Sequence, residues 1–240
     1  MPLKIRIGID QGGTFTDCIA VCSNSIETTT FSCKVLTQSN LQDYSAPHIG
    51  VRQLIQKIRS HYPNQLIDVE SIRLGTTITT NAFLQDRGKS VGVLITAGFE
   101  DLFWIGDQSR KHIFDLRGKN PKPSYASIAG VKERVILKNS NICVETKPQK
   151  EQIKSKLDNF RTHGIESIAI CLIHSWRFTE HEQLIADWCR QEGFKNVFCS
   201  HEISRQPNFL KRSYLTVIDA GLSPLIFNIQ KDFIKNLKDL

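Results

Sequence analysis

The stretch from Arg6 to Val21 reads RIGIDQGGTFTDCIAV, and it decides the architecture of the start of the chain. Two runs of apolar and β-branched residues, Ile5–Asp10 and Phe15–Val21, flank the turn Gln11-Gly12-Gly13, which predicts two strands joined by a hairpin. A third such run, Thr28–Leu36, extends the prediction to an antiparallel meander. Two interpretations of the turn are open. It is either a hairpin whose glycines only provide positive φ angles, or a cradle for phosphate and metal.

The polar residues of the turn favour the phosphate cradle. A magnesium–nucleotide site needs hard oxygen ligands for the metal and donors for the phosphates. A carboxylate that ends a strand can project past the sheet edge, and glycine allows phosphate to approach the backbone N–H groups. The string D-x-G-G-T-x-T-D provides these groups at Asp10, Gly12, Gly13, Thr14 and Thr16. The two threonine hydroxyls are expected on one face, whereas Asp17 falls on the other face and is expected to brace the hairpin.

The rest of the chain alternates between helical and strand patterns. Apolar spacing predicts helices over Ala46–Tyr62, from Thr77 to a stop at Gly88, over Phe99–Gly106, from Pro148 to His163, from a capping box at Thr179–Glu182 to Gln191, and from about Pro224 to Leu237. Further strands are predicted over Ile72–Gly75, Val91–Thr96, Val131–Leu137, Ile168–Ile173 and Val197–Cys199. This order predicts an α/β protein with a mixed sheet.

Composition excludes several classes of function. The 31 Lys and Arg residues exceed the 24 Asp and Glu residues, but the net charge of +7 is spread along the 240-residue chain without a basic, aromatic-rich tract, so we expect no nucleic-acid partner. No apolar run approaches the ~20 residues of a membrane span, and we expect no membrane partner. The seven cysteines include no C-x-x-C pair, and several lie in apolar runs. We therefore expect buried free thiols in a cytoplasmic protein.

A threonine-rich segment, GTTITTNA, begins at Gly75. Thr76 and Thr77 close a strand and open a helix, and Thr80 and Asn81 follow one turn later. A helix N-terminus with free N–H groups suits an anion. The alternative is that Thr76 or Thr77 only caps the helix.

Two further places contain candidate side chains. In the loop after Gly106, Arg110 can hold a carboxylate bidentately and Gln108 can hydrogen-bond a ring amide. A surface ion pair of Arg110 is the alternative. His174 follows a buried strand, where open α/β sheets place ligands, but a structural histidine that holds its loop to Glu182 is the favoured interpretation.

These strings occur together in a known order. RIGIDQGGTFTD, IRLGTTITTNAFLQDRGKSVGVLITAGFEDLFWIGDQSRKHIFDLR, KERV and IAICLIHSW have the order and spacing of the hydantoinase A/5-oxoprolinase family, which this chain resembles from about Lys4 to Leu225. The most specific pieces are G-T-T-x-x-T-N-A and G-x-Q-x-R-x-x-x-F-D-L. The hairpin resembles the first phosphate motif of the actin, Hsp70 and sugar-kinase superfamily.

The resemblance implies a ribonuclease H-like (actin-like ATPase) mixed sheet with flanking helices, of which this chain is the first lobe. It implies an ATP-dependent hydrolase that phosphorylates the amide of 5-oxoproline, as in glutathione metabolism, or of a hydantoin, before a B-type part adds water and opens the ring. Some relatives carboxylate ketones, so the substrate stays open. The implied partners are a small cyclic amide and the remaining A-type and B-type domains or subunits, and a homo-oligomer is compatible with the sequence.

The resemblance also implies residue roles. ATP and Mg²⁺ are the expected cofactors, and Asp10 is the expected metal residue. The expected phosphate-binding residues are Asp10, Gly12, Gly13, Thr14, Thr16, Thr76 and Thr77. The expected substrate-binding residues are Thr80, Asn81, Gln108 and Arg110. The catalytic residues are not identified.

Two of the chain's departures from the family concern the phosphate site. Gln11 stands where relatives commonly have a small or apolar residue or Arg, and we expect its side chain to face solvent. The second phosphate motif of relatives is absent, so we expect residues 1–205 to form the N-terminal domain and 206–240 the truncated start of the next. The isolated chain should then not turn over ATP. The alternatives are a non-catalytic remnant that binds a partner subunit and a sugar-kinase-like phosphotransferase.

Overall fold

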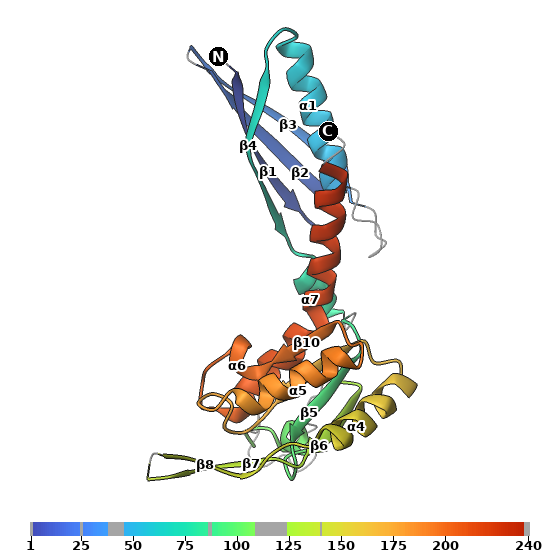
Figure 1. The fold of residues 1–240 in the computed structure, drawn as a ribbon. Coiled ribbons are helices and arrows are strands. Elements are labelled where there is room, and N and C mark those ends of the chain that lie inside the picture. The colour runs from blue at the N-terminus through green and yellow to red at the C-terminus, as the bar shows by residue number, and fades with distance from the viewer. Residues whose placement is uncertain are drawn as a thin grey trace. The chain divides into compact units, whose positions relative to one another are not determined.

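The computed structural model describes residues 2–24, 26–37, 46–85, 88–108, 124–139 and 141–237. The chain forms two compact units (Figure 1). Unit 1 combines Met1–Gln85 with Leu225–Leu240, and unit 2 is Asp86–Pro224. This α/β architecture of mixed sheets with flanking helices confirms the general class predicted from the sequence. The predicted boundary at residue 205 stays a prediction.

Unit 1 is built on a four-stranded mixed sheet in the order β3-β2-β1-β4. The pairs β1–β2 and β2–β3 are antiparallel, which confirms the predicted meander, and β4 lies parallel to β1. Helix α1 runs along the sheet (Figure 1). The elements are β1 (Leu3–Gln11), β2 (Phe15–Ser23), β3 (Thr28–Leu36), α1 (Ala46–His61), β4 (Ile67–Thr76) and α2 (Ile78–Leu84).

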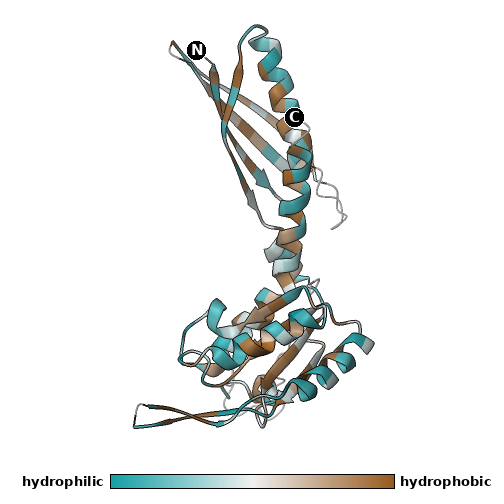
Figure 2. Ribbon diagram, viewed as in Figure 1, coloured by the Kyte–Doolittle hydropathy of each residue, from teal (hydrophilic) through white to brown (hydrophobic). Residues whose placement is uncertain are grey.

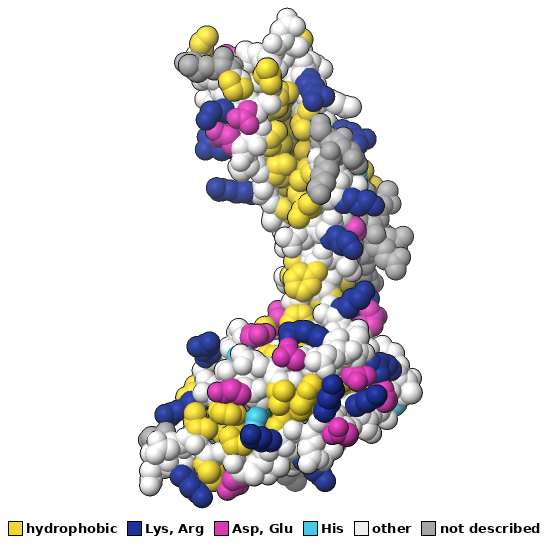
Figure 3. Space-filling view, in the orientation of Figure 1, with side chains coloured by type: hydrophobic (Ala, Val, Ile, Leu, Met, Phe, Trp, Pro, Cys, Tyr) yellow, Lys and Arg dark blue, Asp and Glu magenta, His cyan; other side chains and the backbone are white. Residues whose placement is uncertain are grey.

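The core of unit 1 lies between the sheet and α1. Strand β1 alternates between buried apolar and exposed residues, and its buried side chains pack against the apolar face of α1. Figure 2 shows brown positions along both elements, and Figure 3 shows hydrophobic side chains gathered in a column beside α1. The buried members from β1 and α1 are Leu3, Ile5, Ile7, Ile9, Val51, Leu54, Ile55 and Ile58.

Unit 2 is built on a parallel sheet in the order β10-β9-β5-β6. Strands β5 and β9 are buried at every position, as expected for central strands of a parallel sheet. A separate antiparallel hairpin, β7–β8, follows β6 (Figure 1). The strands are β5 (Val91–Thr96), β6 (Ser127–Val131), β7 (Arg134–Lys138), β8 (Asn141–Thr146), β9 (Ser167–Cys171) and β10 (Asn196–Cys199). The helices are α3 (Leu102–Ile105), α4 (Lys150–Thr162), α5 (Glu180–Gln191), α6 (Ser200–Ile203) and α7 (Phe209–Leu237), the last of which ends in unit 1.

Three predicted helix boundaries are wrong. Helix α2 ends at Leu84, and Gly88 is not its stop. The capping box at the start of α5 does not form, because Thr179 makes no side-chain cap and the Glu182 carboxylate bonds elsewhere. Helix α7 starts at Phe209 instead of near Pro224, because the Asn208 side chain accepts the Lys211 N–H and begins the helix.

The predicted strand Val131–Leu137 is divided in the structure. Lys132 and Glu133 separate β6 from β7, and strand β8 had not been predicted. All seven cysteines are free, and five are buried, as expected from their apolar surroundings. Among the described residues, no helix has the length and apolarity needed to cross a membrane.

Candidate functional site

The ends of β1 and β4 bring the two predicted phosphate segments together in unit 1. The parallel register places Asp10 beside Gly75 and Gln11 beside Thr76. The backbone N–H of Thr77 donates to the Gln11 carbonyl over 3.2 Å, and the Thr76 hydroxyl donates to the same oxygen over 3.3 Å. The hairpin turn and the segment that opens α2 therefore lie at one edge of the sheet.

The two glycines of the hairpin do not provide positive φ angles, since neither has one. That interpretation of the turn is therefore wrong. A Cβ atom at Gly13 would lie 3.3 Å from the side-chain nitrogen of Asn81, and one at Gly12 would lie 3.1 Å from the Phe15 carbonyl oxygen. What the glycines provide is clearance around the backbone, which is the property that an approaching phosphate needs.

Asp10 and Asp17 lie directly opposite each other across β1 and β2, but their surroundings differ. The Asp17 carboxylate lies 3.2 Å from the Lys34 ammonium, so it braces β2 against β3. Asp10 is exposed and has no hydrogen-bond or ion-pair partner among the described residues. Asp10 is thus the carboxylate of this pair that is available to a metal ion.

The hairpin threonines differ in accessibility. Thr14 is exposed, whereas Thr16 is fully buried with its hydroxyl 2.8 Å from that of Thr37. A contact of Thr16 with phosphate would require exchange of this hydrogen bond.

Helix α2 offers fewer free donors than the sequence indicated. It has seven residues, the Thr77 N–H is already bonded to Gln11, and the Ile78 N–H donates to the Thr76 hydroxyl over 3.2 Å. Thr76 therefore satisfies the first N–H of the helix from the position before the N-cap, Thr77, whose own side chain makes no cap. Thr80 is exposed, and Asn81 is half-buried against Gly13.

At this edge, the side chain of Gln11 lies in a different environment from the one that the sequence predicted. Its side chain is fully buried, and neither its amide oxygen nor its amide nitrogen has a hydrogen-bond partner in the described part of the chain. The expectation that it faces solvent is wrong because the alternation of β1 places it in line with Ile7 and Ile9 on the inner face. That alternation is the signal that identifies it. A buried amide without a partner is costly, and such a group commonly has a water or ligand partner.

Replacing Gln11 with leucine should stabilise the chain in the absence of ligands. The substitution removes two unsatisfied buried polar atoms from an apolar face, so we expect the free energy of unfolding to rise by about 1 kcal/mol. Urea denaturation followed by circular dichroism measures this change. Gln56→Leu, at an exposed position of α1, is the control and should leave the stability within about 0.5 kcal/mol. A loss of stability in Gln11→Leu would show that the amide is satisfied.

In unit 2, Gln108 lines a pocket of about 520 Å³ between α3 and the start of α7. Gln108 has a φ of 57°, in the left-handed region that non-glycine residues seldom adopt, and Gly106 has a φ of 60°. Strained backbone of this kind clusters at functional sites. Arg110 lies outside the described residues. The predicted phosphate residues belong to unit 1, whereas Gln108 belongs to unit 2.

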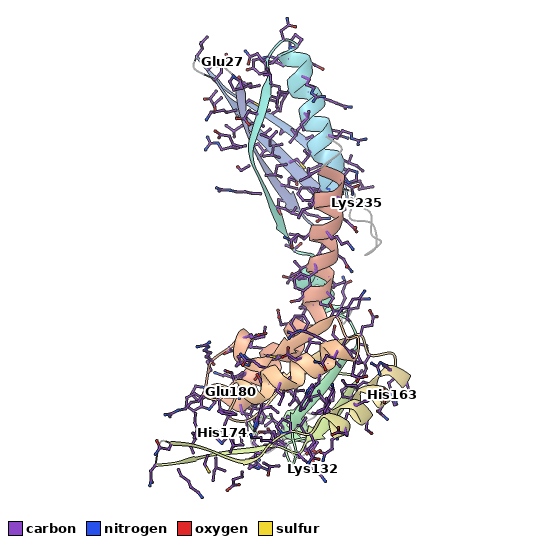
Figure 4. The ribbon with its side chains drawn as sticks, viewed as in Figure 1. Glu27, Lys132, His163, His174, Glu180 and Lys235 are labelled. Atoms are coloured by element: carbon purple, nitrogen blue, oxygen red, sulfur yellow. The ribbon has the colours of Figure 1, made fainter. Side chains whose placement is uncertain are left out.

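His174 follows β9 at the carboxyl edge of the parallel sheet, and Lys132 follows β6 at the same end of unit 2 (Figure 4). Burial lowers the pKa of His174, and the nearby Glu133 carboxylate opposes this shift. Glu133 itself is buried and bonds to His181 over 2.9 Å. The predicted contact of His174 with Glu182 is wrong, because the Glu182 carboxylate is bonded to other groups.

The Glu182 carboxylate is the centre of a buried polar network. It accepts hydrogen bonds from the Leu172 N–H, the Ser200 hydroxyl, and both the backbone N–H and the ring of His201. Cys199 lies close enough to complete a metal-binding trio. However, the carboxylate is already saturated, and burial raises the pKa of the Cys199 thiol, which disfavours the thiolate that a metal needs. The network therefore ties α5 to β9 and α6.

Arg212 extends this network from α7, and its side chain is completely buried. Its guanidinium donates to the carbonyls of Leu172, Ile173 and Gln206 over 2.8, 3.0 and 2.6 Å. Its Nε donates to the Ser200 hydroxyl over 3.1 Å. Arg212 thus fixes both the end of β9 and the segment that leads into α7.

Comparison with known proteins finds one matching family, a relative of known sequence and two solved structures. The family described as hydantoinase/oxoprolinase N-terminal region matches residues 6–193. The 5-oxoprolinase of Saccharomyces cerevisiae is 32% identical over 252 residues, which cover 93% of this chain and 20% of the relative. The chain therefore spans about a fifth of the length of this relative.

Two solved structures share the fold, each with a TM-score of 0.73. An ATP-dependent caprolactamase from Pseudomonas jessenii is 24% identical, with 95% of this chain and 33% of the other covered. Acetone carboxylase, solved nucleotide-free, is 18% identical, with coverages of 98% and 35%.

Proposed function

The chain belongs to the hydantoinase/oxoprolinase family, of which it contains the N-terminal region, and from this premise we propose that it is the N-terminal lobe of an ATP-dependent cyclic amidase. In this proposal the amide of 5-oxoproline or of a hydantoin is phosphorylated before its ring is opened by hydrolysis. The caprolactamase and the 5-oxoprolinase among its relatives support a cyclic amide as the substrate class. The remaining A-type and B-type parts are the proposed partners.

The observation that carries this proposal is the edge where β1 and β4 end together. Asp10, the hairpin glycines and Thr76 converge there through the parallel register of the two strands. The glycines leave clearance without adopting positive φ angles, and Asp10 has no partner among the residues that the structure describes. These properties suit a phosphate chain and a divalent cation.

The residues present fit ATP and Mg²⁺ as the proposed cofactors. Asp10 would hold the metal, and the backbone N–H of Gly13 with the Thr14 hydroxyl would face the phosphates. When bound, ATP supplies the phosphoryl group that activates the amide oxygen. The buried Gln11 amide adds an unsatisfied donor and acceptor beneath the same turn. Thr16 and Thr77 stay proposed phosphate residues, and Thr80 and Asn81 stay proposed substrate residues.

The finer class of the fold is also a proposal. The order β3-β2-β1-β4, with a parallel β4 after an antiparallel meander, supports the ribonuclease H-like, actin-like ATPase class for unit 1. A cytoplasmic location stays a prediction. A non-catalytic role in which the chain binds a partner subunit stays the alternative function. The domain start at residue 206 is likewise proposed.

Asp10→Asn should weaken the binding of magnesium–ADP at least about tenfold, because it removes the free carboxylate from the proposed metal position. Isothermal titration of the chain with ADP, with and without MgCl₂, measures this effect. The loss should appear only in the presence of the metal.

Asp17→Asn is the matched control for this titration. It makes the same chemical change at the opposite position of the hairpin, where the carboxylate already pairs with Lys34. Its affinity for magnesium–ADP should stay within about twofold of the original, since exposed ion pairs contribute little. Equal losses in the two variants, or no magnesium-dependent binding by the original chain, would refute the proposed site.

A further inference from the structure

Two cysteines of unit 1 face each other across the antiparallel strands β2 and β3. The register places Cys18 directly opposite Cys33. In the same register, the backbone N–H of Thr37 donates to the Thr14 carbonyl over 2.9 Å, so every second pair from there, including the two cysteines, is a hydrogen-bonded pair. Such pairs have Cα atoms about 5.5 Å apart, which lies within the range that a disulfide spans.

The two cysteine side chains also converge in space. Both lie on the inner face of the sheet, where α1 covers it. The Cys33 thiol donates to the Gly50 carbonyl of α1 over 3.4 Å, and a Cβ atom added to Gly50 would overlap the Cys18 sulfur. The two thiols also interact with each other through a side-chain hydrogen bond. A bond between the two sulfurs therefore requires no separation of the strands.

The two thiols differ in accessibility and in acidity. Cys18 is 2% exposed, whereas Cys33 is partly exposed and open to a small oxidant. Burial raises the pKa of Cys18 to about 12, and the neighbouring Cys33 adds to this rise. Burial also raises the pKa of Cys33, but the hydrogen bond from Cys18 and the charge of Lys57 oppose that rise. Because the thiolate is the reactive form, Cys33 is the thiol that reacts first.

We propose that Cys18 and Cys33 form a reversible disulfide when the chain is exposed to hydrogen peroxide. The Cys33 thiolate attacks one peroxide oxygen, the O–O bond breaks, and the sulfur becomes a sulfenic acid while hydroxide leaves and takes up a proton. The Cys18 sulfur then attacks the Cys33 sulfur, and the S–O bond breaks as the S–S bond forms. The thiol proton of Cys18 leaves with the hydroxyl group as water. The two thiols lose two electrons, and the peroxide is reduced to two molecules of water.

The disulfide would fix the edge of the sheet next to the proposed phosphate turn. Strand β3 is an edge strand that pairs with β2 alone in the described sheet. Thr16 precedes Cys18 by two residues on the same inner face, and its hydroxyl lies 2.8 Å from that of Thr37. A covalent link between the two strands should suppress the local opening to which edge strands are prone. The modification goes beyond the proposed function and does not depend on nucleotide binding.

Peptide mapping of the chain after treatment with hydrogen peroxide tests the proposal. The remaining thiols are alkylated, and the chain is digested without reductant. Cleavage after Glu27 separates the two cysteines, and tandem mass spectrometry distinguishes Cys18 from Cys22 in the first peptide. We expect a Cys18–Cys33 cross-link that dithiothreitol removes, and Cys33→Ser should abolish it. Cys22→Ser is the matched control, because Cys22 is buried in the same strand but lies opposite Thr29, and it should leave the cross-link unchanged.

Oxidation in urea shows whether the fold selects this pair, because the unfolded chain should distribute its cross-links among all seven cysteines. Hydrogen exchange gives a second measurement. Amides of β3 should exchange at least about threefold more slowly in the cross-linked chain than in the reduced chain, while those of β9 in unit 2 should not change. The proposal would be overturned by the absence of the Cys18–Cys33 cross-link in the folded chain, by a yield no higher than in urea, or by unchanged exchange in β3.

Discussion

Arg212→Ala should lower the free energy of unfolding of unit 2 by about 3–5 kcal/mol, the range seen when one partner of a buried charged network is removed. The guanidinium satisfies the carbonyls of Leu172, Ile173 and Gln206, and all three would lose this donor together. Its loss would also remove the positive charge that Ser200 links to the buried Glu182 carboxylate.

Urea denaturation monitored by tryptophan fluorescence measures this loss, since all three tryptophans of the chain belong to unit 2. Arg205→Ala, at an exposed position, is the control and should stay within about 0.5 kcal/mol. Arg212→Lys should fall between the two, because an ammonium keeps the charge but not the planar fork of donors. A loss below about 1 kcal/mol in Arg212→Ala would contradict the role of this network in stability.

Gly92→Ala should destabilise unit 2 by about 1–3 kcal/mol through overpacking. A Cβ atom at this position of β5 would lie 2.7 and 2.8 Å from two ring carbons of Phe160 and 3.1 Å from Ile165. Strand β5 is central in the sheet, and Phe160 is 1% exposed, so neither partner has open space to move into. The same fluorescence measurement applies.

A second glycine distinguishes overpacking from a general loss of stability when glycine is replaced with alanine. Gly221→Ala places its Cβ atom 3.6 Å from Val91, which is an ordinary contact, within helix α7. It should therefore be neutral or stabilising by up to about 1 kcal/mol. Adding Phe160→Leu to Gly92→Ala should make the combined loss smaller than the sum of the single losses, because the smaller side chain relieves the overlap. Additive losses would rule out overpacking.

Strands and helices with a regular spacing of apolar residues were predicted correctly from the sequence. The alternation along β1 and β2, the apolar spacing of α1 and the buried run of β5 predicted these elements within one or two residues at most boundaries. The glycines that follow α4 and α5, Gly164 and Gly193, have positive φ angles of 66° and 92°, which is typical of glycines that end helices.

The errors come from contacts between residues distant in sequence. Glu182 matched a capping box, but hydrogen bonds to β9 and α6 hold its carboxylate in the core. Pro224 resembled the first residue of a helix, whereas α7 begins at Phe209, fifteen residues earlier and directly after an asparagine cap, and continues through the proline. Lys211 and Gln206 belong to no sequence motif, and only the packing of the start of α7 beside α3 brings them into one pocket.

The discontinuity of unit 1 has a consequence for synthesis on the ribosome. Residues 2–85 precede unit 2 along the chain, whereas Phe233 and Leu237, which pack against the same apolar cluster, follow it. Unit 2 is continuous and can complete its core while the sheet of unit 1 still lacks these side chains. We therefore expect the nascent meander to need protection from aggregation until α7 has been translated, and unit 1 to complete its core after unit 2.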